Sequence, residues 1–355
     1  MKASISLISD LCTPFSIHPA RKKTLSAMIL GAMESGNVHQ IDLARYISTE
    51  NPESALRRVE RFFQHQVLNF TDAARCMVAF LRFEGKFDLC LDRTNWKFGE
   101  KDINYLVLSW RINQSVTLPL LAVELNKAGN SNTQERIDLL QVFGELFGFD
   151  RIRSLIADRE FIGNRWFTQL IEWDVPFYIR VKENTLIPYD DDPIHVNTLF
   201  KHLHQNEFRK VEKEMYGSSV YFAGTRANEG DLVIVISNQD LRPQTILMNY
   251  RKRWSIEEMF RKLKTSGFHW ENTHMKKSAR LLTLLIILSI AALLLYCAGI
   301  NSKAPWKKTL NCPLWSLFRR GMIKLQHMVS KGAEELYKFL VDAVACARKL
   351  AGVKK

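Results

Sequence analysis

The sequence lacks paired cysteines and any spacing of residues that would bind zinc. Its six cysteines, Cys12, Cys76, Cys90, Cys297, Cys312 and Cys346, are scattered along 355 residues without a C-x-x-C pair. Such spacing predicts neither a zinc site nor a disulfide framework. The nine histidines show no ligand-like spacing either. We therefore expect reduced, mostly packed thiols in a cytoplasmic protein.

A secretion signal is also missing, because no charged region followed by an apolar stretch and a small-residue cleavage site opens the chain. There is one long hydrophobic run, residues 281–300 (LLTLLIILSIAALLLYCAGI), preceded by Lys276, Lys277 and Arg280. Crossing a bilayer takes about 20 apolar residues, and cations flank such spans. A helix that is apolar on all sides also occurs at the centre of large soluble domains. This segment alone leaves both interpretations open.

Charge of one sign prevails in the sequence. Fifty Lys and Arg against 37 Asp and Glu give a formal net charge of +13 and a pI near 9.5. Such an excess favours a polyanionic partner, either nucleic acid or an anionic membrane surface. A basic enzyme without such a partner has the same composition. The apolar content of 46% predicts a globular chain with a large core.

Residues 1–80 have the pattern of short helices separated by turns. Cations gather at the start and end of this region, at Arg21, Lys22 and Lys23 and again at Arg57, Arg58 and Arg61. The pattern predicts an all-helical DNA-binding region of the helix-turn-helix kind. An ordinary helical bundle with a solvated basic face is the alternative.

Residues 81–182 have a pattern of short strands and helices. Three apolar runs, FDLCLD, INYLVLSW and VTLPLLAVEL, are separated by turn-like residues near 99–100 and 113–114. They predict an antiparallel meander. Further along we expect a helix over 133–147, a strand over 152–157, a helix over 165–173 and a strand over 176–181. This is the element order of an RNase H-like fold, of class α/β with a mixed sheet.

The rest of the chain divides into three parts. Residues 183–240 predict a β-rich insertion, in which Asp190, Asp191 and Asp192 form a solvated loop. Helical sequence resumes over 241–302 as the second part of the core, with a stop at Gly267. Residues 303–355 predict a C-terminal helical region.

Two aspartates follow apolar runs of the predicted sheet. Asp92 comes after FDLCL and Asp158 comes after RSLIA. Functional sites in α/β folds lie at strand ends, so we expect these carboxylates to meet. Each one alone could equally be a turn former.

A third acid lies on a helix with unusual neighbours. Tyr250, Arg253, Glu257 and Lys264 are spaced so that an ideal helix places all four within an arc of about 60°. An ordinary core helix would carry leucines on that arc. A solvated helix with an ion pair from Glu257 to Arg253 or Arg261 is the alternative.

Three carboxylates suit hard divalent cations. Mg²⁺ prefers oxygen ligands, with Mn²⁺ as a substitute, and two such ions activate the attacking oxygen and stabilise the leaving oxygen at phosphorus. We expect Asp92, Asp158 and Glu257 to be catalytic metal ligands. Arg253 and Lys264 would bind the flanking phosphates, and Tyr250 would add a hydrogen bond.

These motifs resemble a known family. The spacing Y-(2)-R-(3)-E-(6)-K is similar to the YREK signature of DDE transposases in the fourth insertion-sequence family of bacteria. LCLDRTNW and IADREF resemble that family's two aspartate motifs, and the similarity extends over nearly the whole chain. The resemblance implies an RNase H-like catalytic domain, a β-rich insertion before the glutamate helix, and a buried apolar helix after it.

The resemblance also implies a reaction and partners. Water nicks DNA at the transposon end, and the freed 3′-hydroxyl attacks the opposite strand to form a hairpin. Water reopens the hairpin, and the 3′-hydroxyl then attacks target DNA. A homodimer would hold two double-stranded transposon ends, with residues 303–355 as a dimerisation element or an ordinary cap. We expect no membrane partner and a bacterial cytoplasmic enzyme, nucleoid-associated when bound to DNA.

One departure from the family concerns the hairpin. Its relatives stack a flipped base on a tryptophan in the strand before the glutamate helix, but residues 231–236 contain no aromatic residue. Tyr216, Tyr221 and Phe222 are the replacement candidates, since base flipping needs a stacking surface.

The sequence thus predicts a metal-dependent cut-and-paste DNA transposase. A non-catalytic DNA-binding regulator derived from a transposase and a single-span membrane protein are the alternatives.

Overall fold

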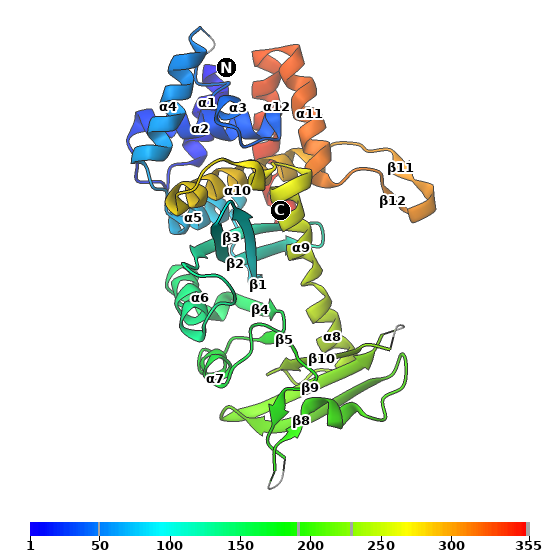
Figure 1. Ribbon diagram of the computed structural model, residues 1–355. Helices are drawn as coiled ribbons and strands as arrows, with labels where there is room; N and C mark the ends of the chain where they lie inside the picture. Colours follow the sequence, from blue (N-terminus) through cyan, green and yellow to red (C-terminus); the bar gives the residue numbers. More distant parts are fainter. Residues whose placement is uncertain (49, 190–191, 228–229, 353–355) are drawn as a thin grey trace.

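An eight-stranded sheet runs through the middle of the chain (Figure 1). The computed structural model describes residues 1–48, 50–189, 192–227 and 230–352, apart from the side chain of residue 310. The strands lie in the order β3-β2-β1-β4-β5-β10-β9-β8. Their bounds are β1 Phe87–Phe98, β2 Lys101–Asn113, β3 Val116–Glu124, β4 Ile152–Ala157, β5 Phe177–Val181, β8 Phe208–Met215, β9 Ser218–Arg226 and β10 Leu232–Ser237.

The first five strands have the arrangement expected of an RNase H-like core. β1, β2 and β3 form an antiparallel meander, and β4 and β5 join parallel to β1. Parallel neighbours need crossover connections, which α6 (Thr133–Phe147) and α7 (Asn164–Glu172) supply. Asn132 and Glu135 form a capping box at the start of α6. The predicted fold class, α/β with a mixed sheet, is confirmed.

The two faces of the core sheet are covered by different helices. Alternate residues of a strand point to opposite faces. Phe87 of β1 packs its ring against Phe143 and Phe147 of α6. Cys90 points the other way, toward Ser255 of α9 (Trp254–Arg261). Asp92 has the parity of Cys90, so its side chain lies on the α9 face.

Three strands of residues 183–240 extend the core sheet. β10 pairs antiparallel with β5, and β9 and β8 follow it outward. A small hairpin of β6 (Leu186–Ile187) and β7 (Ile194–His195) precedes the 3-10 helix η2 (Val196–Phe200). Of the predicted acidic loop, Asp190 and Asp191 lie outside the described residues, and Asp192 is exposed.

The sequence predicted one ideal helix around Glu257, but the structure divides this segment into three pieces. α8 (Pro243–Arg251) ends before a turn at Lys252, and α9 begins after Arg253. The last turn, Lys262–Ser266 (η3), is a π-helix that ends at Gly267. A π turn contains more residues than an α turn, so positions beyond Arg261 leave the face that ideal geometry assigns to them.

The long apolar run forms α10 (Ser278–Ile300), which is buried by protein. It is long and apolar enough to span a membrane, yet 94% of its most hydrophobic window is buried inside the fold. It contacts helices from both ends of the chain, and these gather at one end of the molecule (Figure 1). The helices that contact it are α2 Pro19–Ser35, α4 Pro52–His65, α5 Phe70–Leu81, α11 Leu317–Lys331, α12 Ala333–Ala345 and α13 Ala347–Leu350, and α1 Lys2–Leu11 and α3 Gln40–Leu43 pack against α2.

The structure thus resolves the choice that the hydrophobic run left open in favour of a buried core helix. Gly299 and Gly321 allow α10 and α11 to approach closely, because a Cβ at Gly321 would lie 1.9 Å from the Leu295 carbonyl oxygen. Short pieces complete the chain: η1 Phe149–Arg151, η4 Trp270–Asn272, β11 Trp306–Lys307, η5 Lys308–Leu310 and β12 Cys312–Pro313. The proposed boundaries between domains stay predictions.

Candidate active site

Asp92 and Asp158 lie side by side because of strand pairing. In the parallel β1–β4 pair, Leu91 is opposite Ala157, so the next residue of each segment is one of the two aspartates. Each carboxylate accepts a hydrogen bond from the next backbone N–H, from Arg93 at 2.7 Å and from Arg159 at 2.8 Å. These bonds hold both side chains at the same edge of the parallel pairing.

One expectation about Asp92 was wrong. β1 does not end there but continues to Phe98, paired with β2 throughout. The polar residues after Asp92, which lie beyond the predicted strand, form a long two-stranded extension with β2. What ends at Asp92 is the pairing with β4, and this gives the carboxylate its open side.

Glu257 is brought to the two aspartates by α9. Ile256, Met259 and Leu263 are buried, so one side of the segment is anchored on β1, β2 and β3. Glu257, next to Ile256, lies at the rim of this contact and is 37% exposed at its side chain. Arg253 donates to Asp92 Oδ2 at 3.2 Å and also forms an ion pair with Glu257.

Tyr250 completes the connection between helix and strands. Its hydroxyl donates to Asp158 Oδ1 at 3.2 Å. Asp92, Asp158 and Glu257 are therefore linked through two residues of the helical segment, Arg253 and Tyr250. The ion pair between Glu257 and Arg253 that the sequence left open is present, while Arg261 pairs with Glu258 instead.

The electrostatics of Asp92 are dominated by burial. Its side chain is 18% exposed. Loss of solvent raises the pKa of Asp92 to about 6, although the Arg93 N–H and the Arg253 charge oppose the shift. Nearby Glu160 and Asp158 raise the pKa further. Burial alone would lower the pKa of Arg253, but the groups around it raise the value overall.

Lys264 lies apart from the carboxylates. It forms an ion pair with Glu271 at 2.7 Å, donates to the Asn95 carbonyl at 3.2 Å, and lies 5.4 Å from the Trp96 ring centroid. Both contacts on β1 are only three or four residues beyond Asp92. Lys264 thus lies beside β1, a few residues beyond Asp92, and its contact with a DNA phosphate stays a prediction.

No pattern in the sequence points to the residues that support Asp158. Arg93 forms an ion pair with Glu160 at 3.3 Å, which ties the residue after Asp92 to the loop after Asp158. Buried Arg136 of α6 donates to the Ser131, Glu160 and Ile162 carbonyls. An arginine on a helix looks like a surface residue in a sequence, so only the fold identifies these roles.

The basic residues expected to bind DNA lie on α2 and α4. Lys22 is half-buried and donates to the Thr13 carbonyl, whereas the others are exposed. Arg21 is bonded to Gln66, and Arg57 to Glu53. Those exposed are Arg21, Lys23, Arg57, Arg58 and Arg61. Their DNA-binding role stays a prediction.

The candidate stacking residues differ in accessibility. Phe222 is 1% exposed and belongs to the core, so it cannot receive a base, contrary to our expectation. Tyr216 is half-buried against the Phe167 ring. Tyr221 is also half-buried, with the Lys210 ammonium 4.9 Å from its ring centroid.

Asp92, Asp158 and Glu257 supply the carboxylate oxygens that divalent ions prefer. In this structure Asp92 and Glu257 bind the Arg253 guanidinium instead. Oxygen donors from three acids are what Mg²⁺ and Mn²⁺ prefer. Within the described residues, no three acidic, histidine or cysteine side chains are close enough to hold a metal ion. Arg253 lies between Asp92 and Glu257 and supplies the positive charge that these acids require.

Comparisons with known proteins place the chain in a family. A family model described as "Transposase DDE domain" matches residues 89–294. No curated protein matches the chain. Among solved structures it is similar to the piggyBac transposase in a synaptic complex with hairpin DNA, at 11% identity and a TM-score of 0.46, covering 98% of this chain and 78% of that one. Since the family match includes all three acids and more than half of the sequence, the chain belongs to the DDE transposase domain family.

Proposed function

We propose that the chain is a cut-and-paste DNA transposase, in which Asp92, Asp158 and Glu257 catalyse strand cleavage at transposon ends and strand transfer into target DNA. The observation that carries the proposal is the linkage of the three acids through Arg253 and Tyr250 at the edge of the β1–β4 pairing. Structural ion pairs at a surface do not require two half-buried aspartates to lie side by side. A phosphoryl-transfer site does.

Each residue has a role in this mechanism. When bound, two Mg²⁺ or Mn²⁺ ions would activate the attacking oxygen and stabilise the leaving oxygen at phosphorus. Asp92 and Asp158 would hold them from the sheet and Glu257 from the helix. The buried position of Asp92 excludes water from one side of the site. Arg253 must release Asp92 and Glu257 on metal binding, and its guanidinium then becomes available to a DNA phosphate.

Further details follow from the resemblance of the motifs. We infer membership of the fourth insertion-sequence family from the spacing of Tyr250, Arg253, Glu257 and Lys264. That family implies a hairpin intermediate and a homodimer that holds two ends. The basic helices α2 and α4 would bind the double-stranded end. Tyr216 and Tyr221 are the remaining candidates to stack a flipped base.

The test is cleavage of labelled DNA carrying the ends of the element that encodes the chain, with Mg²⁺ or Mn²⁺. We expect the parent to cut at the ends, and Asp92→Asn, Asp158→Asn and Glu257→Gln to bind the DNA without cutting it. Asp342→Asn, at an exposed position of α12, is the matched control and should cut normally. A parent that binds ends but never cuts would instead be a DNA-binding regulator.

A further inference from the structure

A cationic site lies on another face of α9, the helix that carries Glu257. A cavity of about 450 Å³ is lined by residues of α9, the β2–β3 pair, α10 and the β12–α11 segment. Trp254 and Glu258, four residues apart on one face of α9, line it together with Lys262 at the start of η3. Glu257 lies about 100° around the helix from Glu258. The cavity is therefore separate from the acidic group.

The cavity has a strong excess of positive charge. Among its described lining residues Glu258 is the one acid, and Arg261 neutralises it through two hydrogen bonds of 2.6 and 2.8 Å. Within the described part of the chain, none of the five lining cations takes part in an ion pair, and Arg320 donates a hydrogen bond to the Ser302 carbonyl. The five lining cations are Arg111, Arg251, Lys252, Lys262 and Arg320.

Several buried donors in this lining have no acceptor. Arg111 and Thr117 are opposite each other on β2 and β3. Among the residues that the structure describes, Arg111 Nε, Thr117 Oγ1 and Arg320 Nε are buried without a hydrogen-bond partner. Thr117 as a whole is 3% exposed. These three atoms are shielded from solvent, but a guanidinium can only donate, so the Arg111 and Arg320 side chains beside the cavity favour an acceptor-rich ligand.

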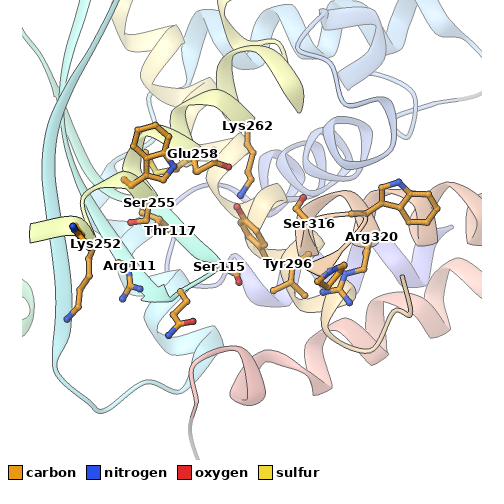
Figure 2. Close-up of a pocket in the computed structure, with 17 residues that line it drawn as sticks. Arg111, Ser115, Thr117, Lys252, Ser255, Glu258, Lys262, Tyr296, Ser316 and Arg320 are labelled. Carbon is orange, nitrogen blue, oxygen red and sulfur yellow. The ribbon is translucent and has the colours of Figure 1, made fainter. Parts of the chain in front are cut away.

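The arrangement of the lining residues favours an oxyanion. Figure 2 shows Lys262 and Tyr296 on one side and Arg320 with Ser316 on the other. The Lys262 ammonium lies 5.4 Å from the Tyr296 ring centroid, and burial lowers the pKa of Lys262. Ser316 begins α11, and a helix N-terminus also favours negative charge. The indoles at the rim are 64% exposed at Trp254 and 36% at Trp315.

We propose that this cavity binds a phosphate group carried by a DNA strand, as a second DNA contact beyond the acidic site. The proposal rests on the chain acting on DNA, as proposed above. A phosphate supplies several acceptor oxygens for the guanidinium groups of Arg111 and Arg320, and its charge matches Lys262. Because the cavity and Glu257 share α9, a strand bound in it is held at a fixed position relative to the acids.

The experiment measures binding of a short labelled single strand and a duplex by fluorescence anisotropy, without divalent metal, using the full chain. Arg111→Gln with Lys262→Gln should weaken binding roughly tenfold or more, because two cations no longer bond to the phosphate. The slope of log affinity against log salt should become shallower by about 0.7 for each phosphate of a single strand that is no longer neutralised. Lys331→Gln, at the exposed far end of α11, removes a charge outside the cavity and should bind like the parent.

Two further arms make the outcome unambiguous. Arg320→Gln removes a third cation of the lining and should also weaken binding. Inorganic pyrophosphate should compete with the strand for the parent protein but not for the double variant. This comparison distinguishes a free phosphate ligand from a DNA phosphate.

Glu257→Gln should bind as the parent does, so failure of cleavage and failure of this site are separable. Cavity variants that bind strands and pyrophosphate as Lys331→Gln does would overturn the proposal, as would a parent that binds neither.

Discussion

Asp92 should cost the protein stability at neutral pH, because it is ionised in a place that water hardly reaches. Its pKa is raised from 3.8 to about 6, mainly by loss of solvent. This rise in the pKa corresponds to a loss of about 3 kcal/mol in the free energy of unfolding once the carboxyl is ionised. The side chain is 18% exposed, so solvent screens little of this effect.

The sign follows from linkage between protonation and folding. Below pH 3.8, Asp92 is protonated in both the folded and the unfolded chain, and no penalty exists. As the pH rises from 3.8 to about 6, the unfolded chain releases the proton first, so stability falls. Above about pH 6 the loss is complete. Asp92→Asn should therefore stabilise the metal-free protein at about pH 8 by about 1–3 kcal/mol and change it little near pH 4.

The assay is urea unfolding at both pH values in the presence of a chelator. Asp342→Asn removes a charge at an exposed position and should show no such pH dependence. If Asp92→Asn is instead destabilised equally at both pH values, the ion pair with Arg253 outweighs the loss of solvent, and the reasoning is refuted.

Two other substitutions test how the site is supported. Gly321→Ala places a Cβ against the Leu295 carbonyl oxygen, so it should reduce the free energy of unfolding in urea by about 1–3 kcal/mol, and an unchanged value would argue against close packing of α11 on α10. Arg136→Met leaves the Ser131, Glu160 and Ile162 carbonyls without their donor, which should cost about 2–4 kcal/mol by the same measurement. It should also reduce end cleavage, because the loop after Asp158 loses its anchor, and wild-type cleavage would show that this loop needs no such support.

The core sheet could be predicted because its elements have strong local patterns. The helix over 133–147 and the strand over 152–157 lie where alternation and capping place them. The pairing of β5 with β10 could not be predicted, because the partner strands are separated by the whole of the inserted segment. Nothing in a strand's own alternation says which other strand lies beside it.

The acidic residues were found from sequence because each is close to a recognisable element end or helix face. The predicted helix face assumed an ideal α-helix. Because residues 262–266 form a π turn, Lys264 contacts Glu271 and the Asn95 carbonyl. The cationic cavity escaped prediction entirely. Arg111, Thr117, Lys262 and Arg320 come from four separate elements, so no spacing in the sequence relates them.

The most direct test of the account is a change of metal preference at Asp158. Carboxylates suit Mg²⁺ and Mn²⁺, whereas a thiolate prefers softer ions. Asp158→Cys should lose end cleavage with Mg²⁺ and regain part of it with Mn²⁺ or Zn²⁺, while Asp342→Cys keeps the metal preference of the parent. If Asp158→Cys cuts as well as the parent with Mg²⁺, Asp158 is not a metal ligand and the three-carboxylate mechanism is wrong.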